Sequence, residues 1–429
     1  MLRVDVQVAP HAQHIAPQPL QFRDISKKHP LILLFFVTNI LPHGTIELLK
    51  KLDFIYFDAG GGHRAAANAL RQVIERQGRP YEIRMVNLQE TLDSMDVFRK
   101  LTGLRMQDIY NAMLKKGWTL GSPQLMAAMH LVIRLSHPKQ VRLLTDFWRT
   151  SRPDMVVSMV PNFDRALGES LRLALPGVPL VTILTDIADY PPHFWIERQD
   201  QHFICGSDKA VEQALDMGRP ASKVHRVSGM ILNPRFYEIA PLTPEGRAAA
   251  RAELGFRPEL PVGLVLFGGE GSAVMLEIAR SLQDRQLLLI CGKNEKLRAR
   301  LQALPRLSPH RAAMFVEGFT VEVPRYMQLA DYFIGKPGPG SLSEAVAMHL
   351  PCIVERNAWT LPQERYNAEW LREQGTGIVL PNFRRIREAA NELLDPPAYA
   401  RFRAATERMR NRAVFEIPEI LERILMDGN

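Results

Sequence analysis

Apolar and polar residues alternate along the chain in two successive series, and each series predicts an α/β domain. Short apolar runs with the length of buried strands are separated by amphipathic stretches with a helical period. The apolar runs of the first series lie at residues 54–57, 83–86, 155–159, 180–184 and 201–205, and those of the second at 262–267, 287–290, 314–316, 331–334, 352–354 and 377–380. Strands that alternate with helices predict parallel, doubly wound sheets.

The two series are separated by residues 235–261, which are rich in Pro and Arg and carry little strand signal. We expect a linker there, between a first domain at 51–234 and a second domain at 262–400. Helices predicted at 401–429 could pack back on the first domain. Ligands of doubly wound sheets bind beyond the carboxyl ends of the strands, so we expect a central cleft that both domains face.

The beginning of the chain does not fit this pattern. Its most apolar run, at 31–37, falls short of the ~20 apolar residues that a membrane-spanning helix needs. We expect residues 1–50 to form an extension outside the main fold.

A helical, basic segment at about 97–150 also interrupts the alternation. Its only acids are Asp108 and Asp146, and Trp118 and Trp148 are expected to be interfacial aromatics. Its cations are Arg99, Lys100, Arg105, Lys115, Lys116, Arg134, Lys139, Arg142 and Arg149. Basic residues among large apolar ones suit contact with anionic lipid headgroups. The alternative is a helical cap with a solvated basic face.

Composition narrows the class of partner. The 429 residues carry a net charge of +8, which favours an anionic partner such as a nucleotide, a nucleic acid or an anionic membrane. Nucleic acid is least favoured, because the basic residues lie among Met and Leu without an aromatic stacking platform. Three cysteines without metal-type spacing predict neither a disulfide scaffold nor a zinc site.

The most informative motif is Lys336-Pro-Gly-Pro-Gly-Ser341, which follows a strand-like run and opens a helical one. Backbone N–H groups at Gly338, Gly340 and Ser341 would then form an anion site at a helix N-terminus. Glu344 lies one turn further, where its carboxylate could reach the two hydroxyls of a ribose. The motif suits a nucleotide, but taken alone it fits an ordinary strand–turn–helix corner equally well.

Two further glycine turns follow the first strand of each series. Gly61 and Gly62 precede His63, whose imidazole could accept a proton from an attacking hydroxyl. Gly269 and Gly271 form a similar loop in the second domain. Neither turn is a Walker A loop, because neither continues as Gly-Lys-Ser/Thr.

Polar residues after other strands complete the candidate site. The stretch 316–320, which contains Phe319, ends a strand where backbone groups could pair with a base edge, and Asp186 ends a strand of the first domain. A later group suits sugar hydroxyls and consists of Gln363, Glu364 and Asn367. Asp186 and Asp189 do not have the Asp-x-Asp spacing of a metal–diphosphate bridge, so we expect no metal.

Taken together and in this order, the motifs resemble those of the GT-B glycosyltransferases, which have two Rossmann-like domains facing a cleft. The family most similar is that of the monogalactosyldiacylglycerol synthases and processive diacylglycerol glucosyltransferases. The motifs are GGGHRAAA at 60–67, Thr185-Asp186 with Trp195, GGEG at 268–271, EGF at 317–319, KPGPGSLSEA at 336–345, and Gln363-Glu364 with Asn367.

The resemblance implies an inverting hexosyltransferase that uses a UDP-sugar, without metal or cofactor, to glycosylate diacylglycerol. It implies that His63 is the base, with Gly61, Gly62, Asp186 and Trp195 on the acceptor side. It implies donor contacts from Gly269, Gly271, Phe319, Lys336, Gly338, Gly340, Ser341, Glu344, Gln363, Glu364 and Asn367. The basic insert matches the region that such enzymes dock on membranes, so a peripheral place on the cytoplasmic face of the cell membrane is expected.

Alternative functions share this layout. One is transfer of N-acetylglucosamine to a polyprenyl-linked peptidoglycan intermediate. Another is a UDP-sugar 2-epimerase, and a third is a nucleotide-binding protein without catalysis. The loop at 268–271 continues as Ser272-Ala273, where the galactolipid enzymes tend to repeat Met and Gly, which leaves the donor sugar open.

Overall fold

The computed structural model describes residues 49–58, 61–92, 122–304 and 312–427. The predicted extension at 1–50, apart from Leu49 and Lys50, lies outside the described residues. So does the part of the predicted insert at 97–121, which includes Trp118.

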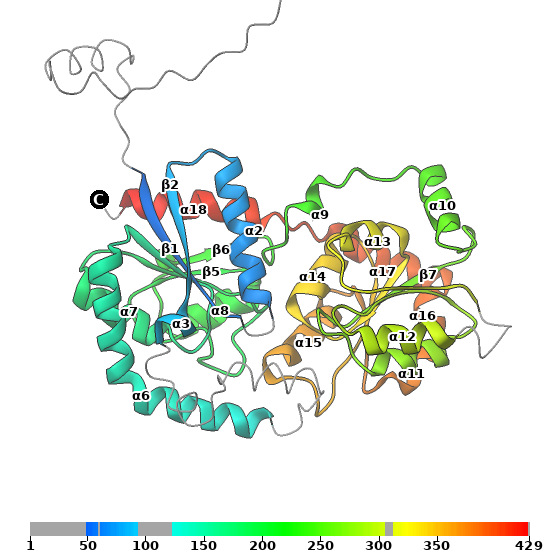
Figure 1. Ribbon diagram of the computed structural model, residues 1–429, viewed down its shortest axis with the longest axis horizontal. Helices are drawn as coiled ribbons and strands as arrows, with labels where there is room; N and C mark the ends of the chain where they lie inside the picture. Colours follow the sequence, from blue (N-terminus) through cyan, green and yellow to red (C-terminus); the bar gives the residue numbers. More distant parts are fainter. Residues whose placement is uncertain (1–48, 59–60, 93–121, 305–311, 428–429) are drawn as a thin grey trace, which may run out of the picture. The chain divides into compact units, whose positions relative to one another are not determined.

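The first lobe contains a six-stranded parallel sheet in the order β2-β1-β3-β4-β5-β6 (Figure 1). Its elements are β1 (Lys50–Tyr56), α2 (Gly62–Arg76), β2 (Tyr81–Asn87), α3 (Leu88–Leu92), α6 (Ser122–Ser151), β3 (Met155–Ser158), α7 (Asp164–Ala174), β4 (Leu180–Ile183), β5 (His202–Cys205), α8 (Asp208–Asp216), η2 (Ala221–Lys223) and β6 (Val224–Arg226).

The second lobe contains another six-stranded parallel sheet, in the order β12-β11-β10-β7-β8-β9. Two short helices lead into it, α9 (Arg235–Glu238) and α10 (Pro244–Glu253). Its elements are β7 (Val262–Leu266), α11 (Val274–Ser281), β8 (Gln286–Ile290), α12 (Glu295–Ala303), β9 (Met314–Glu317), α13 (Val323–Leu329), β10 (Tyr332–Gly335), α14 (Pro339–Ala347), β11 (Cys352–Glu355), η4 (Pro362–Glu364), α15 (Arg365–Glu373), β12 (Gly377–Leu380), η5 (Phe383–Arg385), α16 (Ile386–Leu394) and α17 (Pro396–Arg408).

Burial on both faces explains why the central strands read as continuous apolar runs. Every residue of β7, β8 and β10 is buried, as expected for a parallel sheet covered on both sides. Separate apolar clusters fill the two faces of each sheet. The predicted fold class, two doubly wound α/β units, is confirmed.

The last helix, α18 (Ala413–Asp427), returns to the first lobe and packs on α2 (Figure 1). Its Ile417 and Leu421 join the apolar cluster that contains Leu70 and Ile74 of α2. At the rim of this contact, Arg79 donates to Glu422 at 2.5 Å. The chain therefore passes between the lobes twice.

The two passages are tied together by hydrogen bonds. The Ser228 N–H donates to the Glu416 carboxylate at 2.7 Å, and the Arg412 N–H donates to the Ser228 hydroxyl at 2.7 Å. The Asn411 amide donates to the Met230 carbonyl at 2.9 Å. These bonds hold the two connecting segments side by side.

Helix α10, within the predicted linker, is fixed to the second sheet by charge. Arg247 and Arg251 donate to the two carboxylate oxygens of Asp331 at 2.8 Å and 2.5 Å. Asp331 also accepts from the Val262 N–H at 2.8 Å, at the start of β7. Arg251 is buried, and its guanidinium also donates to the Leu329 and Pro258 carbonyls. This helix consequently belongs to the second lobe.

Helix α6 forms the described part of the basic insert and packs against α7. Trp148 was expected to be an interfacial aromatic, and this expectation is wrong. Its side chain is fully buried, and its indole N–H donates to the Ser170 hydroxyl at 2.9 Å. No helix within the described ranges is long and apolar enough to cross a membrane.

Candidate active site

A cavity of about 1870 Å³ lies where the carboxyl ends of the strands of both lobes meet. Its lining includes most of the sequence-predicted site residues: Gly61, Gly62, His63, Asp186, Gly269, Gly271, Phe319, Lys336, Gly338, Gly340, Ser341, Glu344, Gln363 and Glu364. Two predicted residues, Trp195 and Asn367, are fully buried behind this lining. The structure thus brings together segments that are far apart in the sequence.

His63 lies in the first turn of α2, whose N-cap is Gly61. Gly61 has a φ of +78°, a left-handed conformation that glycine adopts without steric cost. The His63 Nδ1 atom is 3.0 Å from the Thr185 hydroxyl, and its ring lies 5.8 Å from that of Trp195. Burial lowers the pKa of His63 to about 4, against the opposing effect of a hydrogen bond with the Met159 backbone. The imidazole is therefore neutral at pH 7.

The tautomer of His63 decides what the ring can do. With its proton on Nδ1, the ring donates to the Thr185 oxygen, and Nε2 keeps a lone pair. That lone pair can accept a proton from a hydroxyl in the cavity. Thr185 follows β4, so the pairing joins the ends of two strands that are not neighbours in the sheet.

Behind this pair, the loop after β4 is held by buried polar contacts. The Trp195 indole N–H donates to Asp186 at 2.9 Å. Asp189 accepts from the Trp195 backbone N–H at 2.6 Å and from the His193 N–H at 2.9 Å. Burial raises the pKa of Asp186 to about 7, which Glu364 reinforces and the Trp195 hydrogen bond opposes. Trp195 therefore does not line the cavity itself but holds the Asp186 carboxylate, which does.

In the second lobe, the chain leaves β10 at Gly335 and enters α14 at Pro339. Gly338 is the N-cap, and no side chain caps this end of the helix. The N–H groups of Gly340 and Ser341, in the first turn, can therefore bind an anion. Glu344 lies one turn further in the same lining, and burial raises its pKa to about 7.

The loop before α14 carries a cation that is paired. Lys336 Nζ donates to Glu364 at 2.7 Å, and the Glu364 carboxylate is buried. The Asn367 amide donates to the Pro337 carbonyl at 2.8 Å and so holds the same loop from below. Gln363 stands beside Glu364 in η4 and lines the cavity.

The loop after β7 is built for close backbone approach. Gly271 has a φ of +61°, and a Cβ there would lie 2.6 Å from the Cys291 carbonyl oxygen. The neighbouring Lys293 N–H donates to the Gly269 carbonyl at 2.8 Å. Lys293 Nζ in turn lies 5.7 Å from the ring centre of Phe319, which is largely exposed. This geometry is a cation–π contact at the mouth of the cavity.

Sequence reasoning missed Lys293 and Glu355. Both line the cavity, and burial raises the pKa of Glu355 to about 7. Each stands at or just after the carboxyl end of its strand, and that position was the available signal. Within the described side chains, no group of three or more His, Cys, Asp or Glu residues is placed to hold a metal ion.

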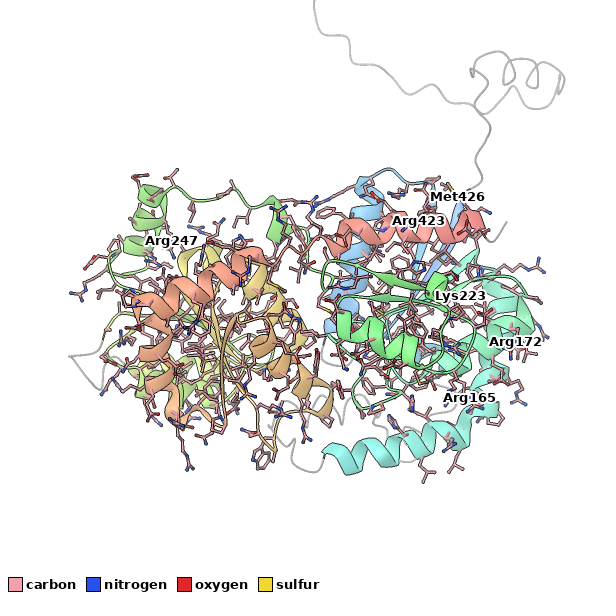
Figure 2. All side chains as sticks on the ribbon, turned by 180° about the vertical axis from the view of Figure 1, so that it is seen from behind. Arg165, Arg172, Lys223, Arg247, Arg423 and Met426 are labelled. Atoms are coloured by element: carbon pink, nitrogen blue, oxygen red, sulfur yellow. The ribbon has the colours of Figure 1, made fainter. Side chains whose placement is uncertain are left out.

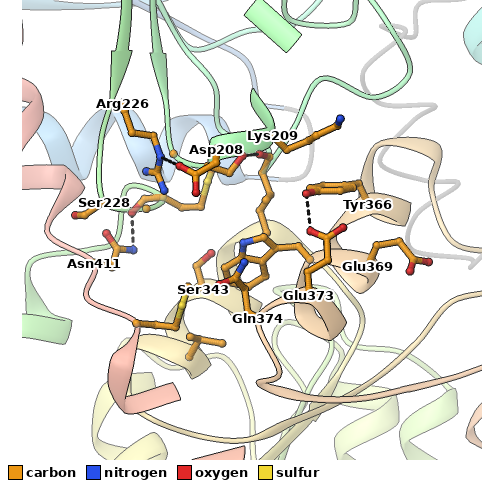
Figure 3. Close-up of a pocket in the computed structure, with 18 of the residues that line it drawn as sticks. Asp208, Lys209, Arg226, Ser228, Ser343, Tyr366, Glu369, Glu373, Gln374 and Asn411 are labelled. Carbon is orange, nitrogen blue, oxygen red and sulfur yellow. Dashed lines mark hydrogen bonds and ion pairs between the residues drawn. The ribbon is translucent and has the colours of Figure 1, made fainter. Parts of the chain in front are cut away.

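A second cavity, of about 810 Å³, also lies between the lobes (Figure 3). None of the predicted site residues lines it, and several of its polar side chains are paired with one another. Arg226 donates to Asp208 at 2.7 Å, Tyr366 donates to Glu373 at 2.9 Å, and the Asn411 amide faces the backbone near Ser228. The larger cavity is therefore the better candidate for chemistry.

Comparison with known proteins agrees with this fold. Residues 264–423 match the model of the glycosyltransferase family 28 C-terminal domain. A probable monogalactosyldiacylglycerol synthase 2 of Oryza sativa subsp. japonica is 28% identical over 370 residues, which cover 80% of this chain and 73% of that protein. Monogalactosyldiacylglycerol synthase 1 of Arabidopsis thaliana is 28% identical over 348 residues, which cover 76% of this chain and 62% of that protein.

Among solved structures, MurG of Acinetobacter baumannii superposes with a TM-score of 0.57 at 13% identity, covering 87% of this chain and 99% of MurG. This likeness concerns the fold. The second lobe is therefore similar to the C-terminal domain of family 28 glycosyltransferases, the chain has the GT-B fold, and its resemblance to the monogalactosyldiacylglycerol synthases is confirmed.

Proposed function

We propose that the protein transfers a hexose from a UDP-sugar to the hydroxyl of diacylglycerol at a membrane surface, with inversion at the anomeric carbon. One observation carries the proposal. A neutral imidazole and an uncapped helix N-terminus, from different lobes, line the same cavity. The imidazole can accept a proton from an acceptor hydroxyl, and the helix N-terminus can bind the leaving diphosphate.

In the proposed reaction, the acceptor oxygen attacks the anomeric carbon while His63 Nε2 takes its proton. One carbon–oxygen bond forms and the bond to the diphosphate breaks, so that UDP leaves with the bonding electrons. In the Nδ1–H tautomer, Thr185 accepts from the Nδ1–H group and fixes the ring. The depressed pKa keeps the imidazole unprotonated at neutral pH.

The second lobe would bind the donor. The first-turn N–H groups of Gly340 and Ser341 stabilise the charge that develops on the diphosphate, as fixed dipoles that need no rearrangement. Lys336, which is paired with Glu364, would offer a further N–H donor beside them. Glu344 accepts hydrogen bonds from the ribose, and Phe319 lies at the uracil. Metal and cofactor independence stays a prediction.

Support for a lipid acceptor comes from the relatives and from α6. The two plant relatives are named as synthases of a galactosylated diacylglycerol. Helix α6 lines the cavity with Val132 and Ile133 and carries exposed cations beside them. We accordingly propose peripheral attachment to an anionic membrane, on the cytoplasmic face of the cell membrane.

The test is incubation of the full chain with UDP-galactose, UDP-glucose or UDP-N-acetylglucosamine and diacylglycerol vesicles, followed by mass analysis of the lipids. We expect one hexosylated diacylglycerol series, and the anomeric proton signal of the product reports inversion. A polyprenyl-linked acceptor and an acceptor-free reaction run in parallel. Transfer to the polyprenyl lipid alone, or interconversion of the UDP-sugars without acceptor, would replace this proposal.

His63→Ala tests the base. We expect a loss of roughly 10²- to 10⁴-fold in turnover, the usual contribution of a general base, with UDP affinity unchanged. His225→Ala, at a half-buried histidine on β6 that does not line the cavity, is the matched control. Near-normal turnover of a folded His63→Ala protein would remove His63 from the reaction.

A further inference from the structure

The mouth of the large cavity is rimmed by exposed apolar side chains from both lobes. In the first lobe, Val132 of α6 is 55% exposed. In the second lobe, Val321 is 55% and Trp359 is 50% exposed, and both line the same cavity as Val132. Exposed apolar residues that stand singly are normal, but a group around one opening marks an interaction site.

The outward face of α6 combines apolar and basic residues. Leu131 and Leu135 are exposed, and Lys139 and Arg142 follow them on the same stripe at helical spacing. The opposite stripe is buried in the lobe and consists of Val141, Leu144 and Trp148. Such a helix suits the boundary between headgroups and acyl chains, and this face is part of the function proposed above.

The second lobe presents Trp359 on a short, well-braced loop between β11 and η4. The Asn357 side-chain oxygen accepts from the Trp359 N–H at 2.8 Å, and the Thr360 hydroxyl accepts from the Asn357 N–H at 3.0 Å. The Asn357 amide donates to the Pro381 carbonyl at 3.2 Å. These bonds fix the backbone that carries a half-exposed indole, so little conformational entropy is lost when the loop binds.

We propose that the second lobe also docks on the bilayer, through Trp359 and Val321, so that an anionic lipid surface contacts both sides of the cavity mouth. Two observations favour a lipid bilayer as the partner of this surface. The indole is amphipathic, as side chains at a membrane interface are. Exposed cations complement anionic headgroups on both lobes. Arg384 after β12 lines the cavity, and Arg134 and Lys139 lie next to the lining residues Ile133 and Gln140 on α6.

This inference rests on the proposed lipid acceptor and deepens it. If both lobes touch the same surface, a diacylglycerol molecule can rise into the cavity without crossing water. The donor lobe then contributes to membrane affinity as well as to nucleotide binding. Docking is measured without donor, so the assay separates it from nucleotide binding even though Trp359 lines the same cavity.

The test is binding of the full chain to vesicles of phosphatidylglycerol and phosphatidylcholine, measured by co-sedimentation without donor. Trp359→Ala should weaken binding about five- to tenfold, the equivalent of losing roughly half the burial of a large apolar side chain. Trp359→Phe should recover most of it. Met426→Ala is the matched control, because Met426 is exposed on α18, at the opposite end of the first lobe from α6 (Figure 2).

A second measurement uses brominated lipids, which quench indoles that lie in the bilayer. Quenching should be strong in the parent protein and much weaker in Trp359→Phe. Equal quenching, or unchanged vesicle binding by Trp359→Ala, overturns the proposal. A change of oligomeric state with unchanged vesicle binding also overturns it, since the surface would then join two copies of the chain. Because neither measurement needs turnover, a failure of the proposed reaction would not be confused with a failure of docking.

Discussion

Replacing Thr185 with valine tests how the cavity prepares its base. The two side chains have nearly the same shape, so the substitution removes one hydroxyl and little else. That hydroxyl lies 3.0 Å from His63 Nδ1 and is the group that would keep the proton on this nitrogen. Without it, the ring can turn or carry its proton on Nε2, where it cannot accept one from the acceptor.

The magnitude follows from one hydrogen bond and one unsatisfied ring nitrogen. A net hydrogen bond contributes about 0.5–1.5 kcal/mol, and leaving a buried donor unpaired costs about 1–3 kcal/mol. His63 is half-buried, so we expect a total of about 1–3 kcal/mol, which corresponds to a loss of kcat of about 5- to 160-fold. The KM for the UDP-sugar should change little, because Thr185 lies on the acceptor side.

The assay is initial-rate transfer to diacylglycerol vesicles with Thr185→Val, and with Thr185→Ser as the variant that restores the hydroxyl. The serine variant should keep most of the activity. If valine and serine have equal turnover, the hydroxyl does not position His63. If valine instead weakens UDP binding at constant kcat, Thr185 acts on the donor and the reasoning fails.

Other expectations concern the donor site, pH and the backbone. Glu344→Gln should weaken UDP binding about tenfold or more by calorimetry, since charge-assisted hydrogen bonds contribute about 1.5–3 kcal/mol; unchanged affinity would exclude the ribose contact. At saturating donor, where UDP already occupies Glu344, the acid limb of kcat should lie near pH 4 rather than 6.5, because turnover needs neutral His63 and burial lowers its pKa to about 4. The value of kcat/KM should also fall as pH drops through about 7, because burial raises the pKa of Glu344 to about 7 and its protonation weakens donor binding. A limb of kcat near 6.5 would contradict the role of His63. Gly271→Ala should lower the Tm more than Gly78→Ala does. Both have positive φ, but only the first places a Cβ 2.6 Å from the Cys291 oxygen. Equal losses of Tm would show that the backbone around Cys291 shifts to make room for the added Cβ, and the prediction would be wrong.

The fold was readable from the sequence because its strands are buried on both faces. β7 and β8 lie deep in their sheet; β7 reads Val-Gly-Leu-Val-Leu, and β8 has four consecutive apolar residues after Gln286. The order of the strands was not readable, because β1 pairs with β3 as well as β2, and nothing local specifies that neighbour. Trp148 was misjudged for a related reason. Its partner Ser170 lies on another helix and decides which way the indole faces.

The candidate site was partly readable because its loops follow strand ends, and parallel strands end at one edge of a sheet. His63 and the first turn of α14 were found in this way. The pairing of His63 with Thr185 spans 122 positions and has no local signature. Lys293 was missed because it carries no motif, and only the fold places it over Phe319.

The return of α18 to the first lobe sets an order for biosynthesis. Ile417 and Leu421 cover the apolar face of α2, but they are translated after the entire second lobe. Until α18 leaves the ribosome, Leu70 and Ile74 lack their final cover, while the second lobe can already be complete. A nascent chain therefore carries a finished second lobe beside an unfinished first lobe. A stop codon between α17 and α18 would yield a protein that keeps the loops of the second lobe and yet becomes a client of chaperones and proteases.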